Sequence, residues 1–137
     1  MTIFEVAFSS NIKEVKKIVR CAQNYISEMI PSIDAEELLD LRLILSELLF
    51  NAVIHGNKNN SEKMVRLKIK ITGNTINAVI SDQGNGFDFS RLSYTNNEAS
   101  SEEHGRGISL VNALVDSLSF AKPGNIIMFC KKVGSYV

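Results

Sequence analysis

The sequence predicts an α+β fold, a two-layer sandwich with helices packed on one face of a mixed, largely antiparallel sheet. Residues 64–72 and 75–81 alternate between apolar and polar side chains around a Gly-Asn turn, which is the pattern of a β-hairpin. Residues 12–29 and 34–55 instead carry apolar side chains at helical spacing, and a second hairpin pattern covers residues 119–132. Because each long strand has one polar face, we expect that face to contact water and the other to be covered by helices.

The elements before the first hairpin follow from local signals. Residues 2–8 alternate and are predicted to form a first strand. Asn11 followed by Glu14 is typical of a capping box and opens the first helix. Pro31 interrupts the chain, and the long second helix is then expected over residues 34–55.

The helix at residues 12–29 also has a basic face. This face is either simply solvated or a contact for an acidic partner. It consists of Lys13, Lys16, Lys17 and Arg20.

After the central hairpin the chain becomes polar for about twenty residues, and a structureless stretch of that length in a compact domain is usually functional. We therefore expect a lid at about residues 87–104. A third apolar helix is predicted at residues 108–118, followed by strands at 119–121 and 125–132.

The composition excludes several classes of protein. A chain of 137 residues with 45% hydrophobic residues and zero net charge is expected to form a single domain, residues 1–137. A neutral balance gives no reason to expect direct nucleic-acid or membrane binding. Cys21 and Cys130 fit no metal-binding spacing. We find no apolar run long enough to span a bilayer and no secretory signal pattern, so a cytoplasmic location is expected.

Three polar side chains interrupt the apolar second helix at steps of four. Glu47, Asn51 and His55 are therefore expected to share one stripe, and Gly56 supplies the expected stop. A carboxylate on a largely buried helix needs a partner, and a polar pocket would provide one for all three groups. The alternative is ordinary structural pairing, with Glu47 on a buried arginine and Asn51 capping a nearby loop.

A second candidate motif follows the strand at residues 75–81. Asp82 ends that strand, while Gly84 and Gly86 allow the backbone to turn sharply and approach a ligand. The carboxylate could accept a hydrogen bond from an exocyclic amine. Asp, Asn and Gly are also the usual residues of a plain surface turn, so the motif alone does not distinguish a binding site from such a turn.

A third motif, Gly105-Arg106-Gly107, comes just before the predicted third helix. Free N–H groups at such a helix start suit a phosphate, and Arg106 could add a charge-assisted contact. The alternative is a flexible entry into the helix. The motif lacks the Gly-Lys-Ser/Thr of a Walker loop, and Leu110 stands where a dinucleotide fingerprint needs its third glycine.

Taken in order, these motifs resemble those of the Bergerat (GHKL) ATP-binding fold, which DNA gyrase, heat-shock chaperones, histidine kinases and mismatch-repair ATPases share. The chain is most similar to the small bacterial anti-sigma-factor serine/threonine kinases. The resemblance covers nearly the whole chain and includes the Asn-Ala-Val-Ile-His-Gly run at residues 51–56.

The resemblance implies a role for each motif residue. Glu47 would be the general base, Asn51 would hold Mg²⁺, and Asp82 would bind the adenine amine. The glycines Gly84 and Gly86 would line the base pocket. The remaining residues would border the site or wrap the phosphates beneath the lid: His55, Gly56, Gly105, Arg106 and Gly107.

The function implied is that of an ATP–Mg²⁺-dependent serine kinase and anti-sigma factor. Such a protein would bind a sigma factor and phosphorylate a serine of a small anti-anti-sigma (STAS-type) protein. The resemblance also implies homodimerisation through the N-terminal strand and helix.

Other functions stay open at this point. The chain could be a nucleotide-binding regulatory module that switches partners without phosphoryl transfer. A detached histidine-kinase catalytic domain and a nucleotide-free structural domain are further alternatives. A gyrase-like ATPase would need a transducer domain that we do not find.

Overall fold

The computed structural model describes residues 3–84, 103–121 and 125–134, with the backbone alone described at residues 103–106. Its strands form one sheet in the order β1-β2-β3-β5-β4, and every pairing among them is antiparallel. The predicted α+β sandwich is confirmed, but these strands contain no parallel pair, so the described sheet is not mixed. The strands are β1 (Ile3–Ser9), β2 (Met64–Thr72), β3 (Thr75–Ser81), β4 (Ser117–Ala121) and β5 (Ile126–Lys132).

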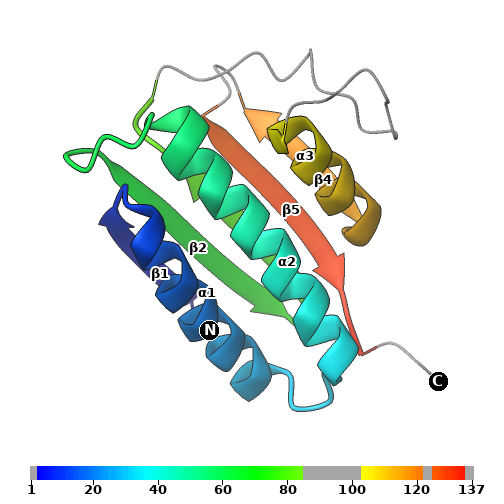
Figure 1. Ribbon diagram of the computed structural model, residues 1–137. Coiled ribbons are helices and arrows are strands. Elements are labelled where there is room, and N and C mark those ends of the chain that lie inside the picture. Colours follow the sequence, from blue (N-terminus) through cyan, green and yellow to red (C-terminus); the bar gives the residue numbers. More distant parts are fainter. Residues whose placement is uncertain (1–2, 85–102, 122–124, 135–137) are drawn as a thin grey trace.

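The helices form the second layer and all lie on the same face of the sheet (Figure 1). α2 (Ala35–Asn51) crosses the middle of this layer, flanked by α1 (Ile12–Met29) and α3 (Glu103–Leu114). Burial alternates along β2, as expected for a sheet with one covered face and one wet face. Within the described ranges, no helix is both long enough and apolar enough to cross a bilayer.

The core lies between α2 and the covered face of the sheet. α2 contributes five fully buried aliphatic side chains, and the strands supply the layer beneath them. Burying side chains of this kind is the main favourable term in folding, at about 25 cal/mol per Å² of apolar surface. The five α2 residues are Leu41, Ile44, Leu45, Leu48 and Leu49.

The predicted start of α2 is confirmed by its cap. The Asp34 side chain accepts a hydrogen bond from the Glu37 backbone N–H at 2.8 Å, and Glu37 Oε1 accepts one from the Asp34 N–H at 3.2 Å. The same glutamate is buried, and its Oε2 accepts a third bond from the Gly134 N–H at 2.8 Å. Glu37 therefore fastens the N-terminal end of α2 to the chain just beyond β5.

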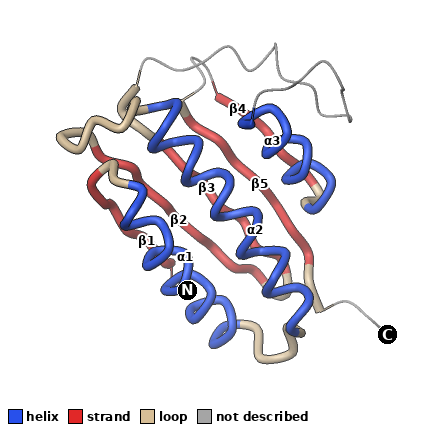
Figure 2. The backbone as a smooth tube through the Cα atoms, in the orientation of Figure 1, coloured by secondary structure: helices blue, strands red, loops and turns tan. Residues whose placement is uncertain are grey.

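The last turn of the predicted second helix is helical but is not an α-helix. The α-helix ends at Asn51, and the chain then forms a π-helical turn, η1 (Ala52–Gly56). The Asn57 N–H donates a hydrogen bond to the Ala52 carbonyl at 2.8 Å. Gly56 is the last residue of this turn, but it lacks the positive φ that is common in glycines at helix ends and that Gly73 and Gly134 have. Tube and ribbon views place this turn at one end of the sheet, near the end of β3 (Figures 1 and 2).

The third helix also differs from its prediction at both ends. It begins at Glu103, so Gly105, Arg106 and Gly107 lie inside its first turns rather than before them. It ends at Leu114, and Leu118 belongs to β4, where it pairs with Phe129 of β5. The final hairpin is confirmed, because pairing with β5 takes the residues after Leu114 away from the helix.

Candidate functional site

The three polar residues of the second helix do not share one environment. Glu47 is half-buried, Asn51 is only 6% exposed, and His55 faces solvent. A spacing of four aligns side chains only while the helix keeps about 3.6 residues per turn. The wider π-turn begins directly after Asn51, so the predicted stripe holds for Glu47 and Asn51 but not for His55.

Asp82 lies at the end of β3 in close contact with two glycines. A Cβ atom at Gly56 would overlap the Asp82 carboxylate, and a Cβ at Gly84 would overlap the Gly56 carbonyl. The Gly84 N–H donates to Asp82 Oδ1 at 2.8 Å. The structure therefore brings together Gly56, Asp82 and Gly84 as predicted, and the reason for glycine at position 56 is the lack of space for a side chain.

Burial raises the pKa of the Asp82 carboxyl above its ordinary value of 3.8, although the Gly84 N–H and the charge of Lys63 lower it. Desolvation therefore outweighs both favourable contacts. A carboxylate kept in such a position is costly to ionise, and perturbed groups of this kind concentrate at functional sites.

Glu47 meets the third motif through Gly107. A Cβ atom at Gly107 would overlap Glu47 Oε2, so the α3 backbone lies directly against the end of this side chain. Two motifs that are sixty residues apart in the sequence are thus adjacent across the α2–α3 contact. Because glycine has no side chain, position 107 leaves room for the Glu47 carboxylate.

Asn51 is the residue best suited to hold a hard cation. The residue is only 6% exposed and lies in the last turn of α2. An amide oxygen one turn from a carboxylate matches the oxygen ligands that Mg²⁺ prefers. In the described ranges no three His, Cys, Asp or Glu side chains are grouped to hold a metal. The donor set fits a cation that keeps few protein ligands and takes others from a bound molecule.

Part of the predicted site lies outside the described residues. Gly86 and most of the predicted lid, residues 87–102, belong to that part, whereas the last two lid positions fall in α3. Gly105 and Arg106 are placed as backbone in the first turns of α3. The phosphate-binding role of these residues stays a prediction.

The sequence-based reading missed Asn57 and Gln83. Residues 57–63 form a polar run, which is typical of a plain turn, yet Asn57 is 1% exposed and its side-chain amide forms hydrogen bonds with three separate segments. The one available signal is its place directly after Gly56, at the end of a predicted helix that carries three candidate site residues.

Comparison with known proteins identifies the family of this chain. The family model described as a histidine kinase-like ATPase domain matches residues 8–131. The serine-protein kinase RsbW of Staphylococcus epidermidis is 33% identical over 99 residues, which cover 66% of this chain and 62% of that protein. The match therefore spans less than two thirds of that relative's length.

Two further relatives carry a different name. The anti-sigma F factor of Anoxybacillus flavithermus is 26% identical over 98 residues, covering 69% of this chain and 66% of that protein. The anti-sigma F factor of Clostridium perfringens is 28% identical over 117 residues, covering 81% and 82%. The family model matches residues 8–131, which is most of this chain. The chain therefore belongs to the histidine kinase-like ATPase domain family.

Proposed function

We propose that this protein is an ATP–Mg²⁺-dependent serine kinase and anti-sigma factor, which binds a sigma factor and phosphorylates a serine of a small anti-anti-sigma protein. The observation that carries the proposal is the adjacency of the motifs. Glu47 lies against Gly107, and Asp82 lies between Gly56 and Gly84, all around the C-terminal end of α2. The names of the relatives, a serine-protein kinase and anti-sigma factors, support the same function.

The base of the nucleotide belongs beside Asp82. One carboxylate oxygen already accepts the Gly84 N–H, and the acid retains lone pairs for the exocyclic amine of adenine. With a backbone free of side chains at Gly56 and Gly84, a flat ring can approach closely. Asp82 thus selects a base with an amine donor at that position.

The triphosphate belongs on the Asn51 side of the site. Bound Mg²⁺ would neutralise phosphate charge, and the Asn51 amide oxygen would be its protein ligand. Glu47 would accept the proton of the attacking serine hydroxyl. A bond forms between the serine oxygen and the γ-phosphorus, the bond to the β-phosphate oxygen breaks, and ADP leaves. A positioned base contributes about 10²- to 10⁴-fold to such a step.

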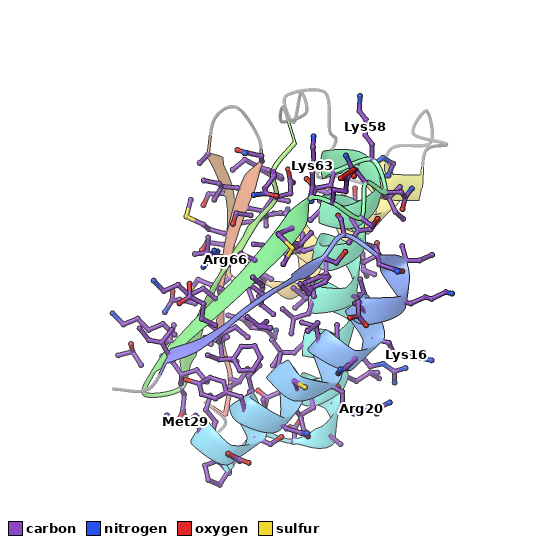
Figure 3. All side chains as sticks on the ribbon, turned by 90° about the vertical axis from the view of Figure 1, so that its left-hand side faces the viewer. Lys16, Arg20, Met29, Lys58, Lys63 and Arg66 are labelled. Atoms are coloured by element: carbon purple, nitrogen blue, oxygen red, sulfur yellow. The ribbon has the colours of Figure 1, made fainter. Side chains whose placement is uncertain are left out.

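A groove between α1 and α2 supports the proposed binding of a protein partner. It encloses about 610 Å³ and has an apolar floor that includes Val15, Val19 and Phe50. Its rim carries cations and no carboxylate, and Lys16 and Arg20 extend from α1 on the side away from the sheet (Figure 3). An acidic, partly apolar segment of a sigma factor would match this surface. The cations are Lys13, Lys16, Arg20 and Arg42.

Charge reversal tests the groove. Arg20→Glu should weaken binding of the purified sigma factor at least tenfold at low salt. Lys68→Glu changes the same charge on an exposed position of β2, on the face of the sheet away from the helices, and should leave binding unchanged. Equal weakening by both variants would show that only net charge matters.

The sheet edge supports the proposed homodimer. β1 pairs with β2 alone among the described strands, so its outer edge is available, and Ile3 is 44% exposed there. Unpaired edges of this kind invite strand addition. A single monomeric mass by light scattering across a hundredfold concentration range would rule the dimer out.

Nucleotide binding with and without Mg²⁺ tests the site itself. Asp82→Asn should weaken ATP binding in both conditions, because base recognition requires no metal. Asn51→Ala should remove mainly the Mg²⁺-dependent part of the affinity. If wild-type protein binds ATP equally well in both conditions, Asn51 is not a metal ligand.

Transfer is tested separately from binding. Labelled ATP and a candidate antagonist should yield phosphoserine with wild-type protein and at least a hundredfold less with Glu47→Gln, at unchanged ATP affinity. If no label reaches a partner serine while ATP is demonstrably bound, the kinase half of the proposal is wrong. Retained partner switching by Glu47→Gln would then identify a binding module.

A further inference from the structure

The Asn57 side chain joins three chain segments at the end of the sheet beside Asp82. Its Nδ2 donates to Ser10 Oγ at 2.9 Å and to the Met64 carbonyl at 3.0 Å, while its Oδ1 accepts from the Gln83 N–H at 2.8 Å. These bonds connect the chain after β1, the start of β2 and the chain after β3. All of them form around a residue that is 1% exposed.

Two of these contacts belong to a closed ring of hydrogen bonds. Gln83 Oε1 accepts from the Met64 N–H at 2.7 Å, so Asn57, Met64 and Gln83 are each bonded to the other two. The Gln83 N–H can only donate, and the Met64 carbonyl can only accept. A side chain that serves both at once needs a donor and an acceptor on one short group, which an amide provides and a carboxylate does not.

The ring fixes the residue next to Asp82. Asp82 itself is held from the opposite side, since its N–H donates to the Asn125 carbonyl at 3.0 Å and Asn125 Nδ2 donates to its carbonyl at 3.2 Å. On the other side Gln83 is held by Asn57. Without the Asn57 amide, the Gln83 backbone would lose its hydrogen bond on this side, and only the Gln83 side chain would still be bonded there, to the Met64 N–H.

We propose that Asn57 is a positioning residue that sets the choice of nucleotide base by fixing the Asp82–Gly84 segment. This inference rests on the proposed function, in which Asp82 binds the base. Adenine presents an amine donor at the position where guanine presents a carbonyl acceptor. A fixed carboxylate accepts from the first and repels the second, whereas a segment free to shift can withdraw the carboxylate and tolerate both.

The test compares Asn57→Ala with Glu37→Ala. The two wild-type side chains are matched, because each is buried and each accepts a backbone N–H at 2.8 Å, from Gln83 and Gly134 respectively. They lie near opposite ends of α2 and η1. A buried polar contact is thus lost in each variant, but only one loss is beside the candidate site.

Hydrogen exchange in nucleotide-free protein measures the restraint directly. In Asn57→Ala the Gln83 amide should exchange at least tenfold faster than in wild type, while the Gly134 amide changes little. Glu37→Ala should give the reverse pattern. Asn57→Asp retains the acceptor for the Gln83 N–H but loses both donors. The exchange rate of its Gln83 amide should therefore lie between those of wild type and Asn57→Ala. Unchanged Gln83 exchange in Asn57→Ala would overturn the inference.

Base selectivity is measured as the ratio of ATP to GTP affinity. This ratio should fall about tenfold in Asn57→Ala and stay within twofold of wild type in Glu37→Ala, even if both variants lose similar thermal stability. An Asn57→Ala protein with the wild-type ratio of ATP to GTP affinity would overturn this inference but leave the proposed function intact. Wild-type protein that binds neither nucleotide would refute the proposed function, and the selectivity role would fail with it.

Discussion

Replacing Gly107 by alanine should separate stability from phosphoryl transfer. Gly107 lies within α3, where alanine is favoured over glycine by about 1 kcal/mol. The added Cβ would overlap Glu47 Oε2, which is the far end of a flexible side chain rather than backbone. Because Glu47 can rotate away, we expect the free energy of unfolding to change by between about zero and +1 kcal/mol.

The same rotation should remove the proposed general base. Asp82, Gly56 and Gly84 are not contacted by the new methyl group, so ATP affinity should stay within about threefold of wild type, a change of less than 1 kcal/mol. Transfer to a partner serine should fall by about 10²- to 10⁴-fold, which is the usual contribution of a positioned base.

Urea unfolding and labelled-phosphate transfer would measure the two effects on the same preparations. Gly73→Ala is the control, since no atom of the described residues lies within 4 Å of a Cβ there, while its φ is +60°. That variant should lose about 1 kcal/mol of stability and keep full transfer activity. A Gly107→Ala protein that transfers phosphate at the wild-type rate would contradict the role of Glu47, and one that loses more than about 1 kcal/mol of stability would contradict the free rotation of Glu47.

Three further predictions concern the site and the core. Gly84→Ala should lose about 1–3 kcal/mol of stability together with ATP binding, because its Cβ would overlap a backbone carbonyl that cannot rotate; a stable variant with full affinity would contradict the contact. Asp82→Asn should be more stable than wild type at pH 7. Because the pKa of Asp82 is raised in the folded state, the protonated carboxyl contributes its full stability below pH 3.8, and this contribution is lost as the pH rises through the pKa of the folded state. The free energies of unfolding of the two proteins, measured in urea, should therefore converge in acid. A difference that stays constant with pH would refute this. Leu45→Ala should lose about 2–5 kcal/mol in the same assay, and a smaller loss would mean that the core around α2 collapses to fill the cavity.

The parts of the fold predicted best are those fixed by local patterns. β2 and β3 have the predicted bounds, because strict alternation and a glycine turn with φ of +60° determine both strands and their register. The start of α2 follows from the Asp34 cap. The end of α2 could not be predicted in this way, since the π-turn carries Gly56 against Asp82, and that contact joins distant parts of the chain.

The site shows the same division. Spacing and residue type predict Glu47, Asn51 and Asp82 as candidates, because acids and amides on apolar elements are conspicuous in a sequence. Asn57 was not conspicuous, since it opens a run that contains several asparagines and lysines. Its burial results from the meeting of three segments, which no local pattern encodes.

The glycine contacts argue that this end of α2 is organised for binding rather than for stability. A carboxylate kept only for structure is normally given a cation or several donors, because burying it otherwise costs free energy. Asp82 has the Gly84 N–H and the charge of Lys63, and its raised pKa indicates that these do not offset its burial. A ligand that donates a hydrogen bond to this carboxylate would offset the remaining cost. The stability predicted to return in Asp82→Asn is therefore the free energy that the fold gives up to keep this carboxylate buried, which is the cost expected if Asp82 has the proposed role in base binding.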